Sequence, residues 1–303
     1  MRAWLAVLAV MVAFGAPGCA RTEPYLEGFH APRGLRLAPD GRLLVTDLGT
    51  GNDDGRVVAV DFATKTQEVL LEGLPSTRGS GQAHADLAGP SGAAMAPDGT
   101  LCVVIGDAAR EGAGFATLRC SDGLEVDLEA FERERNPDGL AFESNPYDVA
   151  WDGADGWYVS DAAANSVLRV GRDGLVTVLA AFPQVPGGRG EGVPTGLAVD
   201  DVGDLWVALF GGAVVVLRKA EAFRVELFSA PEVQPIAVDT TGDVSWLTHR
   251  DEHGAKGRGG INSGGRLVVR YLDRPTAMAR LPGGRFAIAE EARGRVRLVG
   301  PSP

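Results

Sequence analysis

A pattern of proline, glycine and apolar residues recurs six times along this chain of 303 residues. Five copies join an apolar stretch, a glycine-containing turn and a second apolar stretch, and they begin at Pro32, Pro90, Pro146, Pro194 and Pro275. The sixth copy, PIAVDTTGDVSW, is degenerate, and its Pro235 falls two places late against the others. A repeat of this length constrains the fold more than any other feature, because each copy must bury its apolar face against its neighbours.

Each copy has the pattern of a small antiparallel sheet. Its strands meet at turns such as Pro39-Asp40-Gly41, where proline presets φ and glycine takes the position that needs a positive φ. Helical periodicity is weak throughout, with one helical turn expected at residues 130–135. We therefore predict an all-β chain that forms a single six-bladed β-propeller over residues 25–303. The last copy is short, so we expect residues 25–29 to supply its fourth strand and close the ring, which removes an exposed edge.

The first residues have the features of an export signal. Arg2 precedes an uncharged apolar run, residues 3–15, which is too short to span a membrane as a helix. Ala16-Pro17-Gly18-Cys19 is similar to a bacterial lipobox, although Leu is usual three places before the cysteine. We expect residues 1–18 to be a signal peptide, Cys19 to carry the lipid and residues 19–24 to be a tether. The protein would then be a lipoprotein of the bacterial periplasm or cell surface; an ordinary secretory signal is the alternative.

Two further cysteines, Cys102 and Cys120, lie in neighbouring apolar strands joined by a polar loop. In an exported protein such a pair is expected to form a disulfide, and two buried free thiols are the alternative. The formal net charge is −11, and the sequence has no cluster of basic residues. This argues against nucleic acid and anionic membranes as partners, so we expect the protein to meet the membrane only through its lipid. We also expect it to be a monomer.

Several strings of this sequence resemble the ScyD/ScyE family of exported bacterial β-propellers. The strings are GFHAPRGLRLAPDG, GPSGAAMAPDGTL, ESNPYDVAWDG, VSDAAANSVLRV and GVPTGLAV, and the resemblance covers about residues 25–210 in order. It fades beyond Phe210. More distantly, the units are similar to NHL repeats and to the superfamily of gluconolactonase, regucalcin and strictosidine synthase. The resemblance implies a six-bladed propeller outside the cytoplasm, and it implies no established reaction.

Polar residues near the predicted channel are the candidates for a ligand site, because propeller ligands bind where the loops open around the channel. The position that ends the second strand is acidic in three copies, at Asp47, Asp161 and Glu290. Oxygen ligands of this kind suit calcium, so Asn145, Asp161 and Glu290 form a possible cation site. The alternative is that these carboxylates bind backbone amides of their own loops. The full set of candidate ligand-binding residues is Arg33, Asp47, Asn145, Asp161, Asn165, Thr195, His249 and Glu290.

The resemblance to gluconolactonase can be compared residue by residue. It implies a metal held by a Glu, two Asn and an Asp, yet Arg33, Ser91 and Thr195 fall at three of these positions. Asn145 is the one candidate match, and it is a residue out of register. No complete set of catalytic residues is recognisable, so no catalytic residue is assigned and no cofactor beyond possible calcium.

Other polar segments have simpler interpretations. The histidines at positions 30, 84, 249 and 253 are expected in solvated loops on the channel face. The loop GTGNDDG, residues 49–55, could bind calcium at the rim but is also an ordinary turn sequence. The acidic run that contains Asp127, Glu129, Glu132 and Glu134 is expected to be a solvated loop face.

Three functions remain open from the sequence. The first is a propeller that binds a small molecule or a protein partner on its channel face without catalysis. The second is an enzyme, either a metal-dependent lactonase-like hydrolase or a catalyst similar to strictosidine synthase. The third is a purely structural surface lipoprotein.

Overall fold

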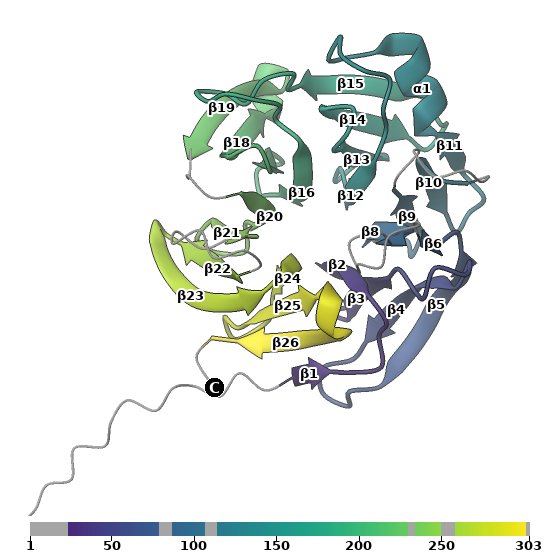
Figure 1. The fold of residues 1–303 in the computed structure, drawn as a ribbon, viewed down its shortest axis with the longest axis vertical. Helices are drawn as coiled ribbons and strands as arrows, with labels where there is room; N and C mark the ends of the chain where they lie inside the picture. The colour runs from purple at the N-terminus through teal and green to yellow at the C-terminus, as the bar shows by residue number, and fades with distance from the viewer. Residues whose placement is uncertain (1–23, 79–86, 107–113, 230–233, 250–257, 301–303) are drawn as a thin grey trace, which may run out of the picture.

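The chain folds as a ring of six small sheets, as the repeat predicts (Figure 1). The computed structural model describes residues 24–78, 87–106, 114–229, 234–249 and 258–300. Each sheet has four antiparallel strands, and the sheets follow one another around a common centre. The fold is therefore a six-bladed β-propeller, and the predicted fold class is confirmed.

The strands of blades 1 to 6 occupy equivalent places in the ring (Figure 1). The innermost strands are β2 (Pro32–Leu37), β8 (Pro90–Met95), β12 (Pro146–Trp151), β16 (Pro194–Val199), β20 (Pro235–Asp239) and β24 (Pro275–Arg280). The second strands are β3 (Leu43–Asp47), β9 (Leu101–Ile105), β13 (Gly156–Asp161), β17 (Leu205–Leu209), β21 (Ser245–Thr248) and β25 (Phe286–Glu290). The third strands are β4 (Gly55–Val60), β10 (Thr117–Cys120), β14 (Ser166–Gly171), β18 (Ala213–Arg218), β22 (Arg258–Ser263) and β26 (Arg295–Val299). The outermost strands are β5 (Gln67–Leu74), β11 (Glu125–Asp127), β15 (Val176–Ala181), β19 (Arg224–Ser229), β23 (Arg266–Asp273) and β1 (Pro24–Leu26).

Blade 6 is completed by the strand that comes first in the sequence. β1 pairs antiparallel with β26, so the sheet order is β1-β26-β25-β24. Leu26 and Phe29 are buried in the cluster that joins blades 1 and 6. The expected ring closure by an N-terminal strand is confirmed, and the open edges at the two ends of the repeat array are joined.

The core lies between neighbouring blades. Successive side chains of a strand point to opposite faces of its sheet. In β3, Val45 packs in the cluster shared with blade 6, whereas Leu44 packs in the cluster shared with blade 2. The second strands are therefore buried on both faces, which explains their continuous apolar sequences.

The proline of blade 5 occupies the same structural place as the others. Pro235 pairs with Thr248 as Pro32 pairs with Asp47, and both pairings open the strand at a bulge. The hairpin of blade 5 is two residues shorter, since 13 positions separate its pair and 15 separate that of blade 1. The apparent shift of Pro235 in the sequence is thus a shortened turn, and the start of the strand is not displaced.

The glycine of the Pro-x-Gly pattern lets the innermost strands of adjacent blades approach each other. A Cβ on Gly34 would lie 2.3 Å from Ser91 O, and a Cβ on Gly196 would lie 2.5 Å from Ala237 Cα. Both distances are shorter than van der Waals contact, so a side chain there forces the strands apart. The same third position holds Gly92, Asp148, Ala237 and Ala277 in the other blades.

The segment between blades 2 and 3 contains a helix that the sequence analysis underestimated. α1 (Leu128–Arg135) has eight residues instead of one turn. Asp127 begins it, because its Oδ1 accepts the N–H of Ala130 at 2.8 Å. The remaining elements are short: η2 (Lys219–Glu221), η3 (Glu291–Arg293), β6 (Thr77–Arg78) and β7 (Leu87–Ala88). None of the helices within the described residues is long and apolar enough to cross a membrane.

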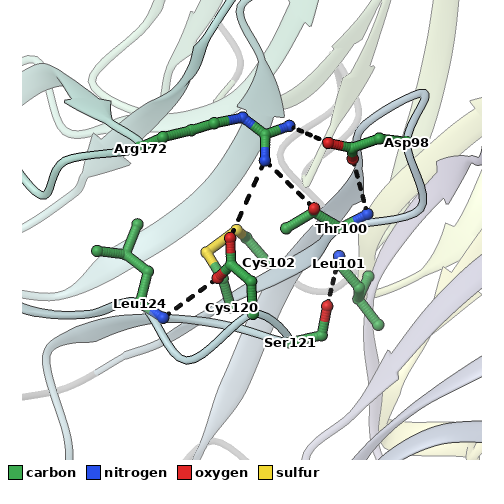
Figure 2. Close-up of a disulfide and its surroundings, with 9 residues drawn as sticks. Asp98, Thr100, Leu101, Cys102, Cys120, Ser121, Leu124 and Arg172 are labelled. Carbon is green, nitrogen blue, oxygen red and sulfur yellow. Dashed lines mark hydrogen bonds and ion pairs between the residues drawn. A yellow bond between two sulfur atoms is a disulfide. The ribbon is translucent and has the colours of Figure 1, made fainter.

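Blade 2 contains a disulfide that joins two adjacent strands (Figure 2). Cys102 on β9 and Cys120 on β10 are paired directly across the sheet. Figure 2 shows Arg172 of blade 3 reaching over this region, where its Nη2 donates to Asp98 Oδ2 at 2.7 Å. The guanidinium also lies 5.0 Å from the ring of Trp151. The two cysteines are thus bonded to each other within blade 2, close to the place where Arg172 of blade 3 contacts that blade.

Candidate functional site

The three acidic residues that end second strands are buried and bonded to protein groups. In blade 1, Asp47 is fully buried and accepts the N–H groups of His30 and Ala31 at 3.1 and 2.8 Å. Arg56 Nη2 donates to its other oxygen at 2.9 Å. These bonds fasten the segment that precedes the innermost strand of the same blade.

The equivalent residues of blades 3 and 6 do the same. Asp161 accepts the N–H of Asn145 at 2.6 Å and the hydroxyl of Ser144. Glu290 accepts the N–H of Asp273 at 3.2 Å and pairs with Arg295 at 2.7 Å. Burial works to raise the pKa of Asp161, and despite its hydrogen bonds the pKa is about 6. The shared position therefore fixes the segment before the innermost strand in all three blades. Asp47 and Asp161 also accept N–H groups of the loops after their own second strands, from Gly49 at 3.3 Å and Ala164 at 3.2 Å, as the alternative predicted.

The structure does not bring the possible calcium ligands together. Asp161 belongs to blade 3 and Glu290 to blade 6, and each carboxylate is already occupied by protein donors. Among the residues that the structure describes, no three His, Cys, Asp or Glu side chains form a group that could hold a metal. This donor set does not fit a calcium ion.

The positions compared with gluconolactonase are also used for contacts within the protein. Arg33 Nε lies 2.8 Å from Glu291 Oε2, so a paired cation occupies the place expected for an acidic ligand. Ser91 Oγ donates to Pro146 O at 2.8 Å, which ties blade 2 to blade 3. Thr195 Oγ1 donates to Ala208 O at 3.1 Å within blade 4. These side chains support the channel wall and do not converge on a metal site.

The remaining candidates lie at separate places. His249 is half-buried, with Nδ1 3.2 Å from Pro275 O and its ring 5.9 Å from that of Phe210. Asn165 is buried and donates from Nδ2 to Asp138 at 2.9 Å and to Glu191 at 3.2 Å. His30 is exposed, while positions 84 and 253 lie outside the described residues.

A cavity of about 160 Å³ lies in the channel and touches the innermost strands of all six blades. Its charged lining residues are Arg33, Arg36, Asp148, Asp239 and Arg280. Among these, Arg36 of blade 1 reaches across to Asp148 of blade 3, with 2.9 Å between Nη2 and Oδ2. Both side chains are mostly shielded, with 22% and 19% of their surface exposed. An ion pair therefore crosses the channel between blades that are not neighbours.

Hydrogen bonds to blade 4 fix this ion pair in place. Arg36 Nη2 also donates to Leu197 O at 3.1 Å, and Leu197 N donates to Asp148 Oδ2 at 2.9 Å. Arg36 Nε is buried and has no hydrogen-bond partner among the described residues. Both oxygens of Asp148 thus accept hydrogen bonds, Oδ1 from the N–H of Val149, whereas the Nε donor of Arg36 is left unused. Leaving a buried donor unpaired costs about 1–3 kcal/mol.

Tyr147 adds a hydroxyl to the wall of the same cavity. Its OH donates to Thr276 O at 3.3 Å, across the channel from blade 3 to blade 6. Burial raises the pKa of Tyr147 well above its usual value, so the phenol stays neutral. A second pocket of about 270 Å³ is lined by Arg36, Leu37, Ala150, Trp151 and other residues near the ends of the inner strands. Arg36 therefore lines both hollows.

Arg36, Tyr147 and Asp148 were not among the site residues predicted from the sequence. For Asp148 a signal was available, because it stands in the third position of its repeat, where the other copies have glycine or alanine. A charged residue at a position that packs two inner strands against each other departs from the rule of the repeat. Such a departure points to a special role at the channel.

Comparisons with known proteins support the fold and leave the site unassigned. No family model matches this sequence, and no curated protein matches it. Among solved structures, the chain is similar to a calcium-binding protein, regucalcin, from Agrobacterium tumefaciens, with a TM-score of 0.57, 12% identity and coverage of 92% of this chain and 93% of that one. It is also similar to virginiamycin B lyase from Staphylococcus aureus, with a TM-score of 0.56, 13% identity and coverage of 93% of this chain and 99% of that one. A third similar structure is XC5397, a gluconolactonase from Xanthomonas campestris, with a TM-score of 0.56, 15% identity and coverage of 91% of this chain and 87% of that one. At these identities the likeness shows a shared six-bladed propeller fold and no more.

Proposed function

We propose that this chain is an exported β-propeller that binds a small, acceptor-rich molecule in its channel without turning it over. The observation that carries the proposal is the Arg36–Asp148 pair, which is held across the cavity with Arg36 Nε unused. Because Nε itself is shielded from solvent, a carboxylate or hydroxyl oxygen bonds this donor only when the Arg36 side chain shifts toward the cavity. The new bond then recovers part of the cost of burying the donor. Guanidinium groups are well suited to carboxylates because they present several donors in one plane.

The size of the cavity limits the ligand class. Drug-sized ligands occupy pockets of roughly 300–1,000 Å³, whereas this cavity measures about 160 Å³. The volume suits a small hydroxy acid better than a large aromatic compound. Three arginines line it, and each already pairs with a carboxylate, so the wall offers hydrogen-bond donors to a ligand and no net positive charge.

Export and family membership belong to the same proposal. They rest on the resemblance of residues 25–210 to ScyD/ScyE propellers and on the signal-like residues 1–18. If Cys19 carries lipid, Cys19→Ala should move the protein from the membrane fraction to the soluble fraction. An unchanged membrane fraction would refute the lipid anchor while leaving the channel site untouched.

The binding proposal can be tested by calorimetric titration of the purified mature protein. The probes are glycolate, malate, tartrate and gluconate, with the amide of glycolate as an uncharged control. We expect at least one acid to bind, and we expect Arg36→Gln to weaken its binding about tenfold or more. The matched control is Arg42→Gln, because Arg42 pairs with Asp40 at a surface turn outside the cavity. Failure of all four acids to bind would contradict the proposed ligand class.

The lactonase-like alternative predicts a different result. A metal-dependent hydrolase would open glucono-δ-lactone faster than the uncatalysed reaction when calcium, magnesium or zinc is added. We expect no acceleration, because Arg33, Ser91 and Thr195 are engaged with protein groups. Metal-dependent turnover that Asn145→Ala abolishes would establish the enzyme and overturn the proposal.

A further inference from the structure

Helix α1 carries a glutamate that is buried instead of solvated. Glu132 is 2% exposed, and its Oε1 is shielded from solvent without a hydrogen-bond partner among the described residues. The other glutamates of the helix are accessible to solvent: the side chain of Glu129 is 31% exposed and that of Glu134 is 71% exposed. They pair with Arg133 and Arg135, respectively. The expectation that this acidic run is a solvated face is therefore wrong for Glu132.

The charges that act on Glu132 are both negative. They belong to Asp138, which follows the helix, and to Asp161, which ends β13. Both side chains are buried, with 9% and 1% of their surface exposed. Glu191 approaches the same region from the loop between β15 and β16, because Asn165 donates to both Asp138 and Glu191.

Basic side chains on the elements packed against Glu132 are engaged elsewhere. Arg133 and Arg135 of α1 pair with acidic neighbours on the exposed side of the helix. On β10, which contacts α1, Arg119 pairs with Glu125 of the next strand at 3.1 Å. Among the described residues, none of the salt bridges involves Glu132, Asp138, Asp161 or Glu191, and the three arginines above pair with other carboxylates.

The residues around the cluster form a strap over blade 3, which we define as residues 136–145. Asn136 N donates to Glu132 O at 2.8 Å at one end of the strap, and Asn145 N donates to Asp161 at the other. Between them, Asp138 accepts from Asn165 at 2.9 Å. The strap leads directly into β12, which begins at Pro146 and carries Tyr147 and Asp148 into the channel.

The protonation state of Glu132 determines how much its burial destabilises the fold. Burial, followed by the charges of Asp138 and Asp161, raises the pKa of Glu132 from 4.5 to about 7. A pKa that is higher in the folded state means that folding favours the protonated form. The stability that this proton contributes is fully present below pH 4.5 and is lost as the pH rises through about 7.

We propose that α1 and the strap form a pH-operated latch, closed when Glu132 is protonated and released when it ionises. In the closed state a neutral carboxyl beside Asp138 and Asp161 leaves one fewer charge in the cluster. Ionisation adds a buried, unpaired charge, which the segment relieves by moving Glu132 into solvent. Because the strap is continuous with β12, release loosens the chain just before Tyr147 and Asp148.

The test is hydrogen exchange of residues 136–145 in the mature protein between pH 5 and pH 8.5, corrected for the pH dependence of chemical exchange. In the wild type we expect the opening equilibrium to rise about tenfold or more across this range. Glu132→Gln mimics the protonated side chain, so its strap should stay closed above pH 7. The pH dependence that remains should be that of Asp161, whose pKa is about 6 and which holds the far end of the strap. The matched control is Glu134→Gln on the exposed face of the same helix, which should behave as the wild type.

A second variant protects the test against a folding defect. Asp138→Asn removes one of the two charges that act on Glu132, so it should move the midpoint of opening to lower pH without abolishing it. The proposal is overturned if wild type and Glu132→Gln show the same pH profile, or if Asp138→Asn leaves the midpoint unchanged. Exchange in β17 of blade 4 serves as the internal reference and should not change over this pH range.

Discussion

Arg36 and Asp148 form an ion pair across the channel of the propeller, with 2.9 Å between Arg36 Nη2 and Asp148 Oδ2. The pair links blade 1 to blade 3, and Leu197 of blade 4 bonds to both side chains. Neighbouring blades of a propeller hold together through apolar contacts, so a charged link between distant blades is not needed for the ring itself. Its cost must be offset by its own geometry or by a ligand.

The first prediction concerns the energy of this pair. Asp148→Asn keeps the shape of the side chain but leaves the Arg36 guanidinium with no opposite charge. We expect the free energy of unfolding in urea to fall by about 1–3 kcal/mol. The double variant Arg36→Met/Asp148→Asn removes the unpaired charge and should recover part of this loss. Strictly additive effects of the two substitutions would show that the pair is not coupled.

The second prediction concerns the glycine of the repeat. Gly34→Ala would place a Cβ 2.3 Å from Ser91 O, so strands β2 and β8 must move apart. We expect a loss of about 3 kcal/mol or more in the free energy of unfolding, because a clash with backbone cannot be relieved by a rotamer change. The control is Ala277→Gly at the same repeat position of blade 6, which should cost about 1 kcal/mol. Equal effects would contradict the packing account of the Pro-x-Gly pattern.

The third prediction concerns the disulfide in blade 2. Cys102 and Cys120 are 18 positions apart, so their bond closes a loop of moderate length. Loss of such a cross-link costs about 2–4 kcal/mol in the chain-entropy description. A thiol count on unfolded, unreduced mature protein should find neither cysteine free, and reduction should lower the unfolding temperature. Two reactive thiols in the unreduced protein would refute the bond.

The fourth prediction concerns acid stability of the loop between β3 and β4. Burial works to raise the pKa of Asp54, but hydrogen bonds from Thr50, Asn52 and Ser76 outweigh it and lower the pKa to about 2. A lowered pKa contributes stability above pH 3.8 that is lost as the pH falls through about 2. Asp54→Asn should therefore cost about 1–2 kcal/mol at pH 7 and almost nothing at pH 2.

The control for this prediction is Asp201→Asn, at an exposed position in the turn of blade 4. It should leave stability unchanged at both pH values. If Asp54→Asn were as costly at pH 2 as at pH 7, the hydrogen bonds to the ionised carboxylate would not be the source of the stability. Residues 49–55 are also the loop that could bind calcium at the rim. Within it, the Asp54 carboxylate accepts hydrogen bonds from Thr50 and Ser76.

Much of the fold follows from the sequence because propeller blades are local units. The proline that starts each inner strand and the glycine turn that follows are close in sequence, so the pairing of Pro32 with Asp47 could be predicted from one copy alone. Ring closure by β1 could also be predicted, because the last copy lacked a fourth strand. The helical propensity of residues 128–135 was underestimated, since the apolar positions are few and Asp127 was assigned to a loop.

The candidate site was harder to predict because it depends on contacts between distant copies. Asp47, Asp161 and Glu290 share a sequence position, but whether they face the channel or the backbone is decided by the loops folded against them. The raised pKa of Glu132 depends on its burial and on the charges of Asp138 and Asp161, which lie outside the helix. Asp148 was detectable as an exception to the repeat, whereas its partner Arg36 could be found only once the ring had closed.

The proposed channel site is tested most directly by observing the side-chain Nε–H of Arg36 by NMR. In the ¹⁵N-labelled mature protein, the resonance assigned through Arg36→Gln should shift on titration with the acid that binds most tightly. Because Arg36 Nε has no acceptor among the described residues, we predict a downfield proton shift that saturates with the binding curve. The Nε–H of Arg42 serves as the control and should not move. A ligand that binds without shifting the Arg36 resonance would contradict the account.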